Sequence, residues 1–254
     1  MRTGYMGWAD PALVANSGTS SPFLLLGDHA GREVPPELAQ LGLMEADLAR
    51  HIGWDIGVFG LGQRLARTLD ATFISQRFSR LVIDSNRDPM RADAVPEISD
   101  GTTVPGNLAI DEHERSARVA GIFTPYHNRI AAELDARAAR GMPTIVVALH
   151  SFTPVMQGFQ RPWQFSVLHL GGSAFSDAML AQLRAEADRP QVGDNEPYKM
   201  DGVDFTVPYH AIRRGLDYVE LEVRQDLLAD AAGQKAVAER LTRVLPAALG
   251  ECGY

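Results

Sequence analysis

Two short apolar runs that stop abruptly at histidines constrain the fold of this chain more than any other feature. Residues 22–27 are almost wholly apolar and are followed at once by Asp28 and His29, and residues 144–149 are followed by His150. An uninterrupted apolar run of this length is typical of a strand that is buried on both faces. Because open α/β sheets bind ligands at the carboxyl ends of their strands, both histidines are candidate site residues.

The rest of the chain alternates between strand-like and helix-like patterns. Further strands are expected at residues 71–75, 81–84, 164–170 and 217–223. Helices are expected at 54–69, 111–140 with a kink at Pro125, 173–187 with a cap at Ser173 or Ser176, and 233–249, with short helical pieces at 37–41 and 45–51. This alternation, with no repeat or linker, predicts a single α/β domain over residues 1–254 with a largely parallel sheet. Residues 87–108, which hold several prolines, glycines and aspartates, are expected to form a long functional loop.

The charge balance narrows the class of partner. Lysine and arginine total 24 against 32 aspartates and glutamates, a formal net charge of −8. A surface of this sign repels phosphate backbones and anionic lipid, so neither nucleic acid nor a membrane is expected as a partner. A small anionic ligand would need a local basic pocket.

Cysteine usage and the N-terminal residues predict the compartment. Cys252 is the single cysteine, which excludes a disulfide framework and a cysteine-rich zinc ribbon. The first twenty residues, which include Arg2 and Trp8, lack the apolar segment of a signal peptide. The longest apolar runs are far shorter than the roughly 20 residues of a membrane span. We therefore expect a protein of the reducing cytoplasm.

The two histidines at strand ends predict a metal site. The spacing of residues in the sequence does not decide which carboxylate is the third ligand. A catalytic zinc site takes three ligands from histidine, aspartate or glutamate and keeps one position for water. Besides His29 and His150, the candidates are Glu33, in the loop after His29, and Asp55, at the start of a helix. Asp55 alternatively pairs with the free backbone donors of that helix, and Glu33 alternatively is a solvated loop carboxylate.

A pair of glutamates on a late strand supplies a candidate general base. Glu220 and Glu222 alternate with Val219, Leu221 and Val223, so both glutamates point to one face of the strand. A metal hydrolase needs one carboxylate that is not a ligand to take a proton from water. Glu222 is the better candidate because it lies nearer the strand end.

Arginines are concentrated in one segment of this acidic chain. Arg77, Arg80, Arg87 and Arg91 all fall within residues 77–91. Arginine binds carboxylates in a bidentate geometry that lysine does not reproduce. The segment therefore predicts either a carboxylate-binding spot or internal pairing with the nearby aspartates Asp84, Asp88 and Asp93. In isolation, His113, His127 and His210 indicate no particular role.

Seven segments, in order along the chain, carry a family resemblance. They are residues 28–31 with Pro35, 53–58, 80–87, 106–107, 125–127, 149–152 and 220–224. On these segments the sequence resembles the N-formylglutamate amidohydrolase family over nearly its whole length. The resemblance implies a phosphorylase/hydrolase-like fold, a three-layer α/β sandwich around a mixed, largely parallel sheet of about eight strands. It is also the basis for the predicted substrate class and for a place in histidine degradation.

The resemblance also implies residue roles. His29, Asp55 and His150 would hold zinc, with another divalent metal as an alternative and Glu33 as the reserve third ligand. Glu222 would act as general base, with His127 as a further catalytic group. The substrate would be bound by Asn86, Arg87, Arg80 and His210.

The implied reaction is metal-dependent hydrolysis of the amide of an N-formyl amino acid such as N-formyl-L-glutamate, a small anionic substrate. The alternatives are hydrolysis of another N-acyl amino acid or peptide-like amide, and a metal-free protein that binds dicarboxylates.

Overall fold

Alternate side chains of the central strands enter two separate apolar clusters. The computed structural model describes residues 7–171 and 173–253. On β2 (Phe23–Gly27), Phe23 and Leu25 belong to one cluster, and Leu24 and Leu26 belong to the other. Both faces of the strand are therefore buried, which explains why its sequence is apolar without polar alternation.

The sheet has seven strands in the order β1-β3-β2-β6-β11-β9-β10. β2 pairs in parallel with β3 and β6, β6 pairs in parallel with β11, and β9 pairs in parallel with β10. The pairs β1/β3 and β11/β9 are antiparallel. The predicted mixed, largely parallel sheet is thus confirmed, with seven strands among the described residues rather than about eight. The bounds are β1 Ala12–Ala15, β3 Thr72–Gln76, β6 Ile145–Phe152, β9 Phe165–Leu168, β10 Val192–Asp194 and β11 Tyr218–Arg224.

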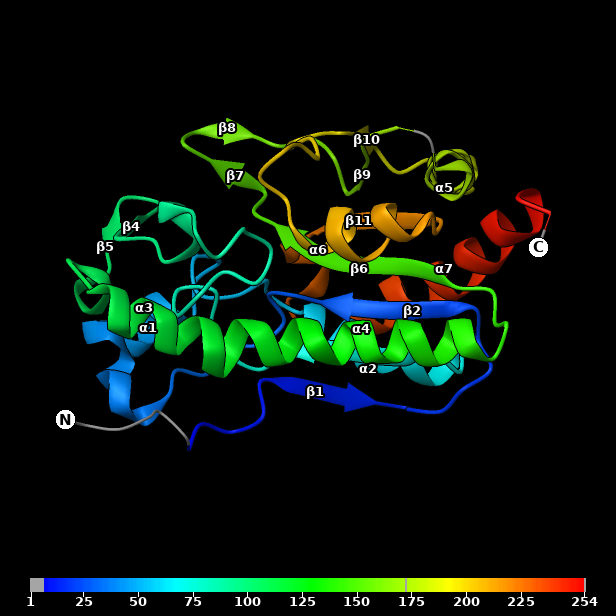
Figure 1. Cartoon of the computed structure of the whole chain (residues 1–254). Helices are drawn as coiled ribbons and strands as arrows, with labels where there is room; N and C mark the ends of the chain where they lie inside the picture. The colour runs from blue at the N-terminus through cyan, green and yellow to red at the C-terminus, as the bar shows by residue number, and fades with distance from the viewer. Residues whose placement is uncertain (1–6, 172, 254) are drawn as a thin grey trace.

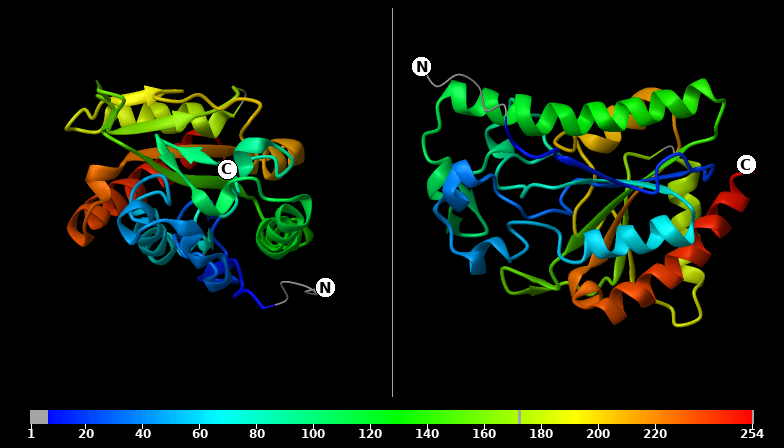
Figure 2. Two further views of the ribbon diagram at one scale, coloured as in Figure 1. Left: turned by 90° about the vertical axis from the view of Figure 1, so that its left-hand side faces the viewer. Right: turned by 90° about the horizontal axis from the view of Figure 1, so that it is seen from below.

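Helices cover both faces of this sheet, which completes the predicted three-layer α/β sandwich (Figures 1 and 2). One layer consists of α2 (Val58–Thr68), α5 (Ala174–Ala185) and α7 (Ala231–Glu251). The other face is covered by α4 (Thr124–Ala139) with the short α6 (Thr206–His210). The Ser173 hydroxyl accepts a hydrogen bond from the Ser176 N–H, so Ser173 is the cap of α5.

The long helix predicted at 111–140 is continuous but changes its winding before Pro125. α3 (Glu112–Arg118) leads into a π turn (Val119–Phe123), and α4 follows directly. Proline has no N–H and displaces the carbonyl four residues before it, and one wider turn accommodates both effects. The side chain of Asp111 caps α3 by accepting a hydrogen bond from the Glu114 N–H.

The prediction of a strand at 81–84 is wrong. These residues form a turn in which the Val82 N–H bonds to the Ser79 carbonyl, while the Asp84 N–H bonds to the Ala94 carbonyl at 2.7 Å. Leu81, Val82 and Ile83 are apolar because they fill a third cluster beneath the loops. The end of the segment is thereby left free to place Asp84 in a cavity.

Several strands were not predicted because they are too short to show a recognisable pattern of apolar and polar residues. Among them are β1, β10 and two small hairpins, one made of β4 (Ile98–Ser99) and β5 (Thr102–Thr103), the other of β7 (Val155–Met156) and β8 (Phe159–Gln160). The predicted helical pieces at 37–41 and 45–51 appear as a 3-10 segment, Pro36–Gly42, and α1 (Glu45–Leu48). Further 3-10 turns are Ala92–Ala94, Pro105–Asn107, Ile212–Arg214 and Gln225–Leu228.

None of the helices in the described residues is long and apolar enough to cross a membrane. Arg2, which entered the signal-peptide prediction, lies outside the described residues.

Candidate active site

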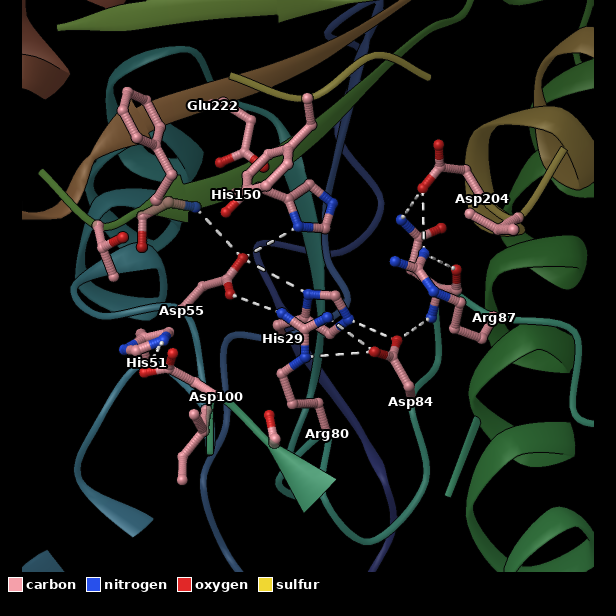
Figure 3. A pocket seen from close by; sticks show the side chains of 18 of the residues that line it. His29, His51, Asp55, Arg80, Asp84, Arg87, Asp100, His150, Asp204 and Glu222 are labelled. Carbon is pink, nitrogen blue, oxygen red and sulfur yellow. Dashed lines mark hydrogen bonds and ion pairs between the residues drawn. The ribbon is translucent and has the colours of Figure 1, made fainter. Parts of the chain in front are cut away.

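A cavity of about 710 Å³ opens where the carboxyl ends of β2, β6 and β11 meet. Its wall includes His29, Asp55, His150 and Glu222, and the long loop at 87–108 contributes Asp100 at the rim (Figure 3). This is the edge at which open α/β sheets bind ligands.

His29, Asp55 and His150 form a buried cluster within this cavity. One ligand atom from each residue lies within 4.8 Å of the others. His29 follows β2, His150 lies in β6, and Asp55 precedes α2, held in place because its N–H donates to the His29 carbonyl at 2.8 Å. The Asp55 carboxylate accepts hydrogen bonds from the Ser151 N–H and from His150 Nδ1, and it does not cap α2. The helix-start interpretation of Asp55 is therefore wrong.

The cluster has the spacing and the donor atoms of a metal site. Asp55 Oδ2 lies 3.5 Å from His29 Nδ1 and 3.0 Å from His150 Nδ1. A tetrahedral zinc with bonds of about 2.05 Å holds its ligands roughly 3.3 Å apart. His29 Nδ1 is buried without a hydrogen bond, an unusual cost for a polar atom unless it binds something.

The outer nitrogen of each histidine faces a second carboxylate, as is common for histidines that bind metals. His29 Nε2 donates to Asp84 Oδ1 at 2.7 Å, which leaves the lone pair on Nδ1 toward the cluster. His150 Nε2 lies 3.7 Å from Asp28 Oδ2, and the other oxygen of Asp28 accepts a hydrogen bond from the Tyr126 hydroxyl. The residues present thus fit a divalent metal.

The protonation of the cluster follows from opposing effects. Burial alone would raise the pKa of Asp55, but the charge of His29 and the hydrogen bond and charge of His150 outweigh it and lower that pKa. Burial and Arg80 depress the pKa of His29, yet the charges of Asp84 and Asp55 raise it overall. Without an ion, the carboxylates therefore hold protons on the histidines that a metal would displace.

Glu33, the reserve ligand, lies outside the cluster. Its side chain is 59% exposed and pairs with Arg77 at 3.3 Å, away from the cavity wall. The structure therefore brings Asp55, and not Glu33, to the two histidines.

Glu222 and Glu220 both line the cavity, as the strand alternation predicted. Glu222 stands beside His150 in the parallel register of β11 and β6. One carboxyl oxygen of each glutamate is buried without a hydrogen bond. Burial raises the pKa of Glu222 to about 7 and that of Glu220 to about 8, with His150 partly opposing the rise. A carboxyl group that titrates near neutral pH is suited to acid–base catalysis.

The arginine segment divides between the cavity and the surface. Arg80 and Arg87 line the cavity, whereas Arg77 and Arg91 do not. Arg77 pairs with the exposed Glu33, and Arg91 pairs with Asp93, a carboxylate on the cavity wall. Of the four arginines in the predicted basic spot, the structure therefore places two on the cavity wall.

The predicted substrate-binding groups at 80–87 all have partners within the chain. Arg80 pairs with Asp84 at 2.8 Å and lies 3.5 Å from Asp55. Arg87 pairs with Asp204 at 3.1 Å. The Asn86 amide oxygen accepts hydrogen bonds from two N–H groups at the start of α6, and its nitrogen donates to Asp204. Internal pairing, the alternative interpretation of this segment, therefore accounts for these contacts.

His127, predicted as a further catalytic group, and His210, predicted to bind substrate, are not among the residues that line the cavity. His127 Nε2 donates to the Ser85 carbonyl at 3.0 Å, so its Nδ1 accepts from His210 Nε2 at 2.9 Å. Burial lowers the pKa of His127 to about 3 and that of His210 to about 4. The two rings form a neutral pair between α4 and α6.

Sequence reasoning missed several residues of the cavity. Asp84 stood inside a recognised segment, but its contact with His29 depended on the turn at 81–84. Arg161, Tyr198 and Lys199 line the same cavity from loops that had no distinctive pattern. The one sequence signal that distinguishes Arg161 from the other arginines of the cavity is that no aspartate or glutamate lies near it in the chain.

A family model described as N-formylglutamate amidohydrolase matches residues 21–229. The crystal structure of a gene product from Agrobacterium tumefaciens is similar at 36% identity, with 97% of each chain covered and a TM-score of 0.93. An N-formylglutamate amidohydrolase from Ralstonia eutropha JMP134 shares the fold at 19% identity, covering 97% of this chain and 100% of that one, with a TM-score of 0.66. No curated protein matches the sequence. The match over most of the chain shows that this protein, an amidohydrolase with a buried His-Asp-His cluster, belongs to the N-formylglutamate amidohydrolase family.

Proposed function

We propose that this protein is a zinc-dependent hydrolase that cleaves the linear amide of an N-formyl or other N-acyl amino acid, with N-formyl-L-glutamate as the leading candidate. The observation that carries the proposal is the buried group of His29, Asp55 and His150 beside Glu222 in one cavity of a chain of this family. A cavity of about 710 Å³ is within the range of small-molecule sites.

In this proposal His29, Asp55 and His150 bind the metal, and neighbouring residues fix the orientation of these three side chains. His29 and His150 would present Nδ1 to the ion, Asp55 would present its carboxylate, and Asp84 fixes the His29 tautomer. When bound, such an ion supplies Lewis acidity toward a water and toward the amide carbonyl. Arg80 pairs with Asp84 and lies 3.5 Å from Asp55, and its charge lowers the pKa of Asp84, so that this carboxylate stays ionised.

Glu222 carries the proton transfers. Its free carboxyl oxygen takes a proton from the attacking water and delivers it to the nitrogen of the departing amine. With a pKa of about 7, the side chain exchanges this proton at neutral pH. The products are formate, or another carboxylate, and the free amino acid.

The test combines metal content with turnover. Purified protein is analysed for bound elements, and formate release from N-formyl-L-glutamate is measured before and after treatment with a chelator and after adding back zinc or other divalent ions. We expect about one metal per chain and activity that is lost and restored with it. Asp55→Asn should lose both metal and turnover, whereas Glu33→Gln should keep both.

Full activity in metal-free protein would overturn the metal-dependent mechanism. Metal-free protein that binds dicarboxylates without turnover would instead support the binding-protein alternative. A panel of N-acyl amino acids separates the formyl substrate from other acyl groups. Zinc as the native ion, a cytoplasmic location and a place in histidine degradation remain predictions.

A further inference from the structure

The arginines that line the cavity differ in whether a carboxylate of the protein is paired with them. Arg80 lies against Asp84 and Asp55, and Arg87 lies against Asp204 (Figure 3). Each guanidinium is therefore already paired with a carboxylate, and a substrate carboxylate that approached it would compete with that partner.

Arg161 lies in the same cavity and has no such partner. Within residues 7–171 and 173–253, no carboxylate forms an ion pair with it, although it is only 6% exposed. A buried charge without a counter-ion costs free energy, so proteins rarely retain one for structure alone. This arrangement indicates that an anionic group of a bound ligand serves as the counter-ion of Arg161.

The guanidinium of Arg161 is held in place by its surroundings. One terminal nitrogen donates to the carbonyl and the hydroxyl of Thr153 at 3.3 and 3.1 Å. The guanidinium carbon lies 4.7 Å from the ring centre of Tyr198 and 5.9 Å from that of Phe152. Its backbone N–H bonds to the Pro154 carbonyl, at the base of the hairpin formed by β7 and β8. An arginine has five N–H donors, and the bonds to Thr153 use one nitrogen only.

This guanidinium also lies on the side of the cavity where the general base stands. Tyr198, which the Arg161 guanidinium contacts, lines the same cavity as Glu222. The Arg161 carbonyl accepts a hydrogen bond at 3.4 Å from Arg224, which lies two residues after Glu222 on β11. Phe152 and Thr153 follow His150 in the chain with only Ser151 between. A ligand bound to Arg161 can thus reach the metal cluster and Glu222 within one cavity.

We propose that Arg161 binds the substrate's carboxylate and makes the site selective for N-acyl amino acids with a free carboxylate near the scissile amide. Lys199, an exposed cation on the wall of the same cavity, adds attraction at the rim. The proposal rests on the proposed function for the identity of the substrate, but the carboxylate site itself can be tested without turnover.

The first experiment measures binding of the amino acid product to the purified protein by calorimetry. The probes are L-glutamate, L-glutamine, which lacks the side-chain carboxylate, and L-isoglutamine, which lacks the α-carboxylate. For wild type we expect L-glutamate to bind more tightly than one of the two amides, and that amide identifies the carboxylate recognised.

Arg161→Gln should weaken L-glutamate binding roughly 10- to 150-fold, the usual effect of losing a hydrogen bond to a charged group. It should also abolish the preference for L-glutamate over that amide. Arg161→Lys, which keeps the charge but not the planar fork, should have intermediate affinity and guards against a folding defect in the first variant. Arg184→Gln, an exposed arginine on α5, is the matched control and should bind as wild type does.

Equal affinity of wild type and Arg161→Gln for L-glutamate, a preference that persists in the variant, or no binding by wild type would overturn the proposal. KM values for the three corresponding N-formyl compounds form a second arm and should follow the same pattern. If wild type binds L-glutamate through Arg161 but hydrolyses none of these compounds, the carboxylate site stands and the proposed reaction fails.

Discussion

Glu222 owes its acid–base character to its position on β11. The strand alternation buries Val219, Leu221 and Val223 against the layer of α2, α5 and α7, which turns the two glutamates toward the cavity. Burial then raises the pKa of Glu222, the charge of His150 lowers it in part, and Asp55 raises it further. The glutamate that is best placed to serve as a base thus also lies beside the cluster of His29, Asp55 and His150.

We expect Glu222→Gln to lower kcat by roughly 10²- to 10⁴-fold, because the variant keeps the shape of the side chain but cannot accept the proton. Its metal content should match that of wild type, since Glu222 is not among the three clustered residues. Steady-state kinetics of formate release, together with elemental analysis, checks both parts. A variant that keeps nearly full kcat would exclude Glu222 as the base.

At the scale of elements, the site depends on how α2 begins. Gly57 precedes α2 with φ of +83°, a conformation that disfavours residues with a Cβ. A Cβ added there would lie 2.4 Å from Leu228 Cβ and 2.5 Å from the Leu228 carbonyl oxygen. The chain therefore needs glycine two residues after Asp55 to bring α2 against the turn at Gln225–Leu228.

Gly57→Ala should therefore destabilise the fold by about 2 kcal/mol or more, combining backbone strain with a clash against a main-chain atom. Because the clash lies beside Asp55, metal affinity should fall as well. Gly60→Ala, inside α2, is the control, since its Cβ would meet only the flexible end of Gln234. Urea unfolding compares the two variants, and equal stabilities would refute the requirement for glycine at Gly57.

The neutral pair of His127 and His210 joins α4 to α6 and makes this contact sensitive to acid. Both pKa values lie below the ordinary value of 6.5, so between about pH 6.5 and pH 4 the unfolded chain binds more protons than the folded one. Stability should be full above pH 6.5 and fall as the pH drops, by about 1–2 kcal/mol for each histidine at pH 5.

His210→Gln should reduce this pH dependence, because one of the two titrating groups is gone. The exposed His113, changed to Gln on α3, serves as control and should leave the dependence as it is in wild type. The measurement is the free energy of unfolding in urea at pH 7 and at pH 5. The same difference between the two pH values in His210→Gln and wild type would contradict the assignment.

For the whole molecule, the features that depend on local sequence pattern were predictable, whereas those that depend on tertiary packing were not. The buried strands and their terminal histidines were predictable, since apolar runs and polar ends are visible in the chain itself. The turn at 81–84 was not, because its apolar side chains fill a cluster beneath loops rather than a sheet. The family resemblance implied site roles for His127 and His210, but packing leaves both off the cavity wall. No role was predicted for Arg161, which stands out only in the structure, where no carboxylate of the described residues pairs with it.

The proposed metal site joins three separate parts of the chain, and we expect a bound ion to contribute to global stability. His29, Asp55 and His150 come from the end of β2, the start of α2 and β6, so an ion held by all three binds the folded state and not the unfolded one. At a free metal concentration 100 times Kd, the gain is about 2.7 kcal/mol. For a chain of 254 residues this raises Tm by roughly 5–10 °C. Thermal unfolding with and without chelator measures the shift, which should disappear in Asp55→Asn and persist in Glu33→Gln. A Tm that does not respond to chelator in a protein shown to have bound metal would mean that the ion sits outside this cluster.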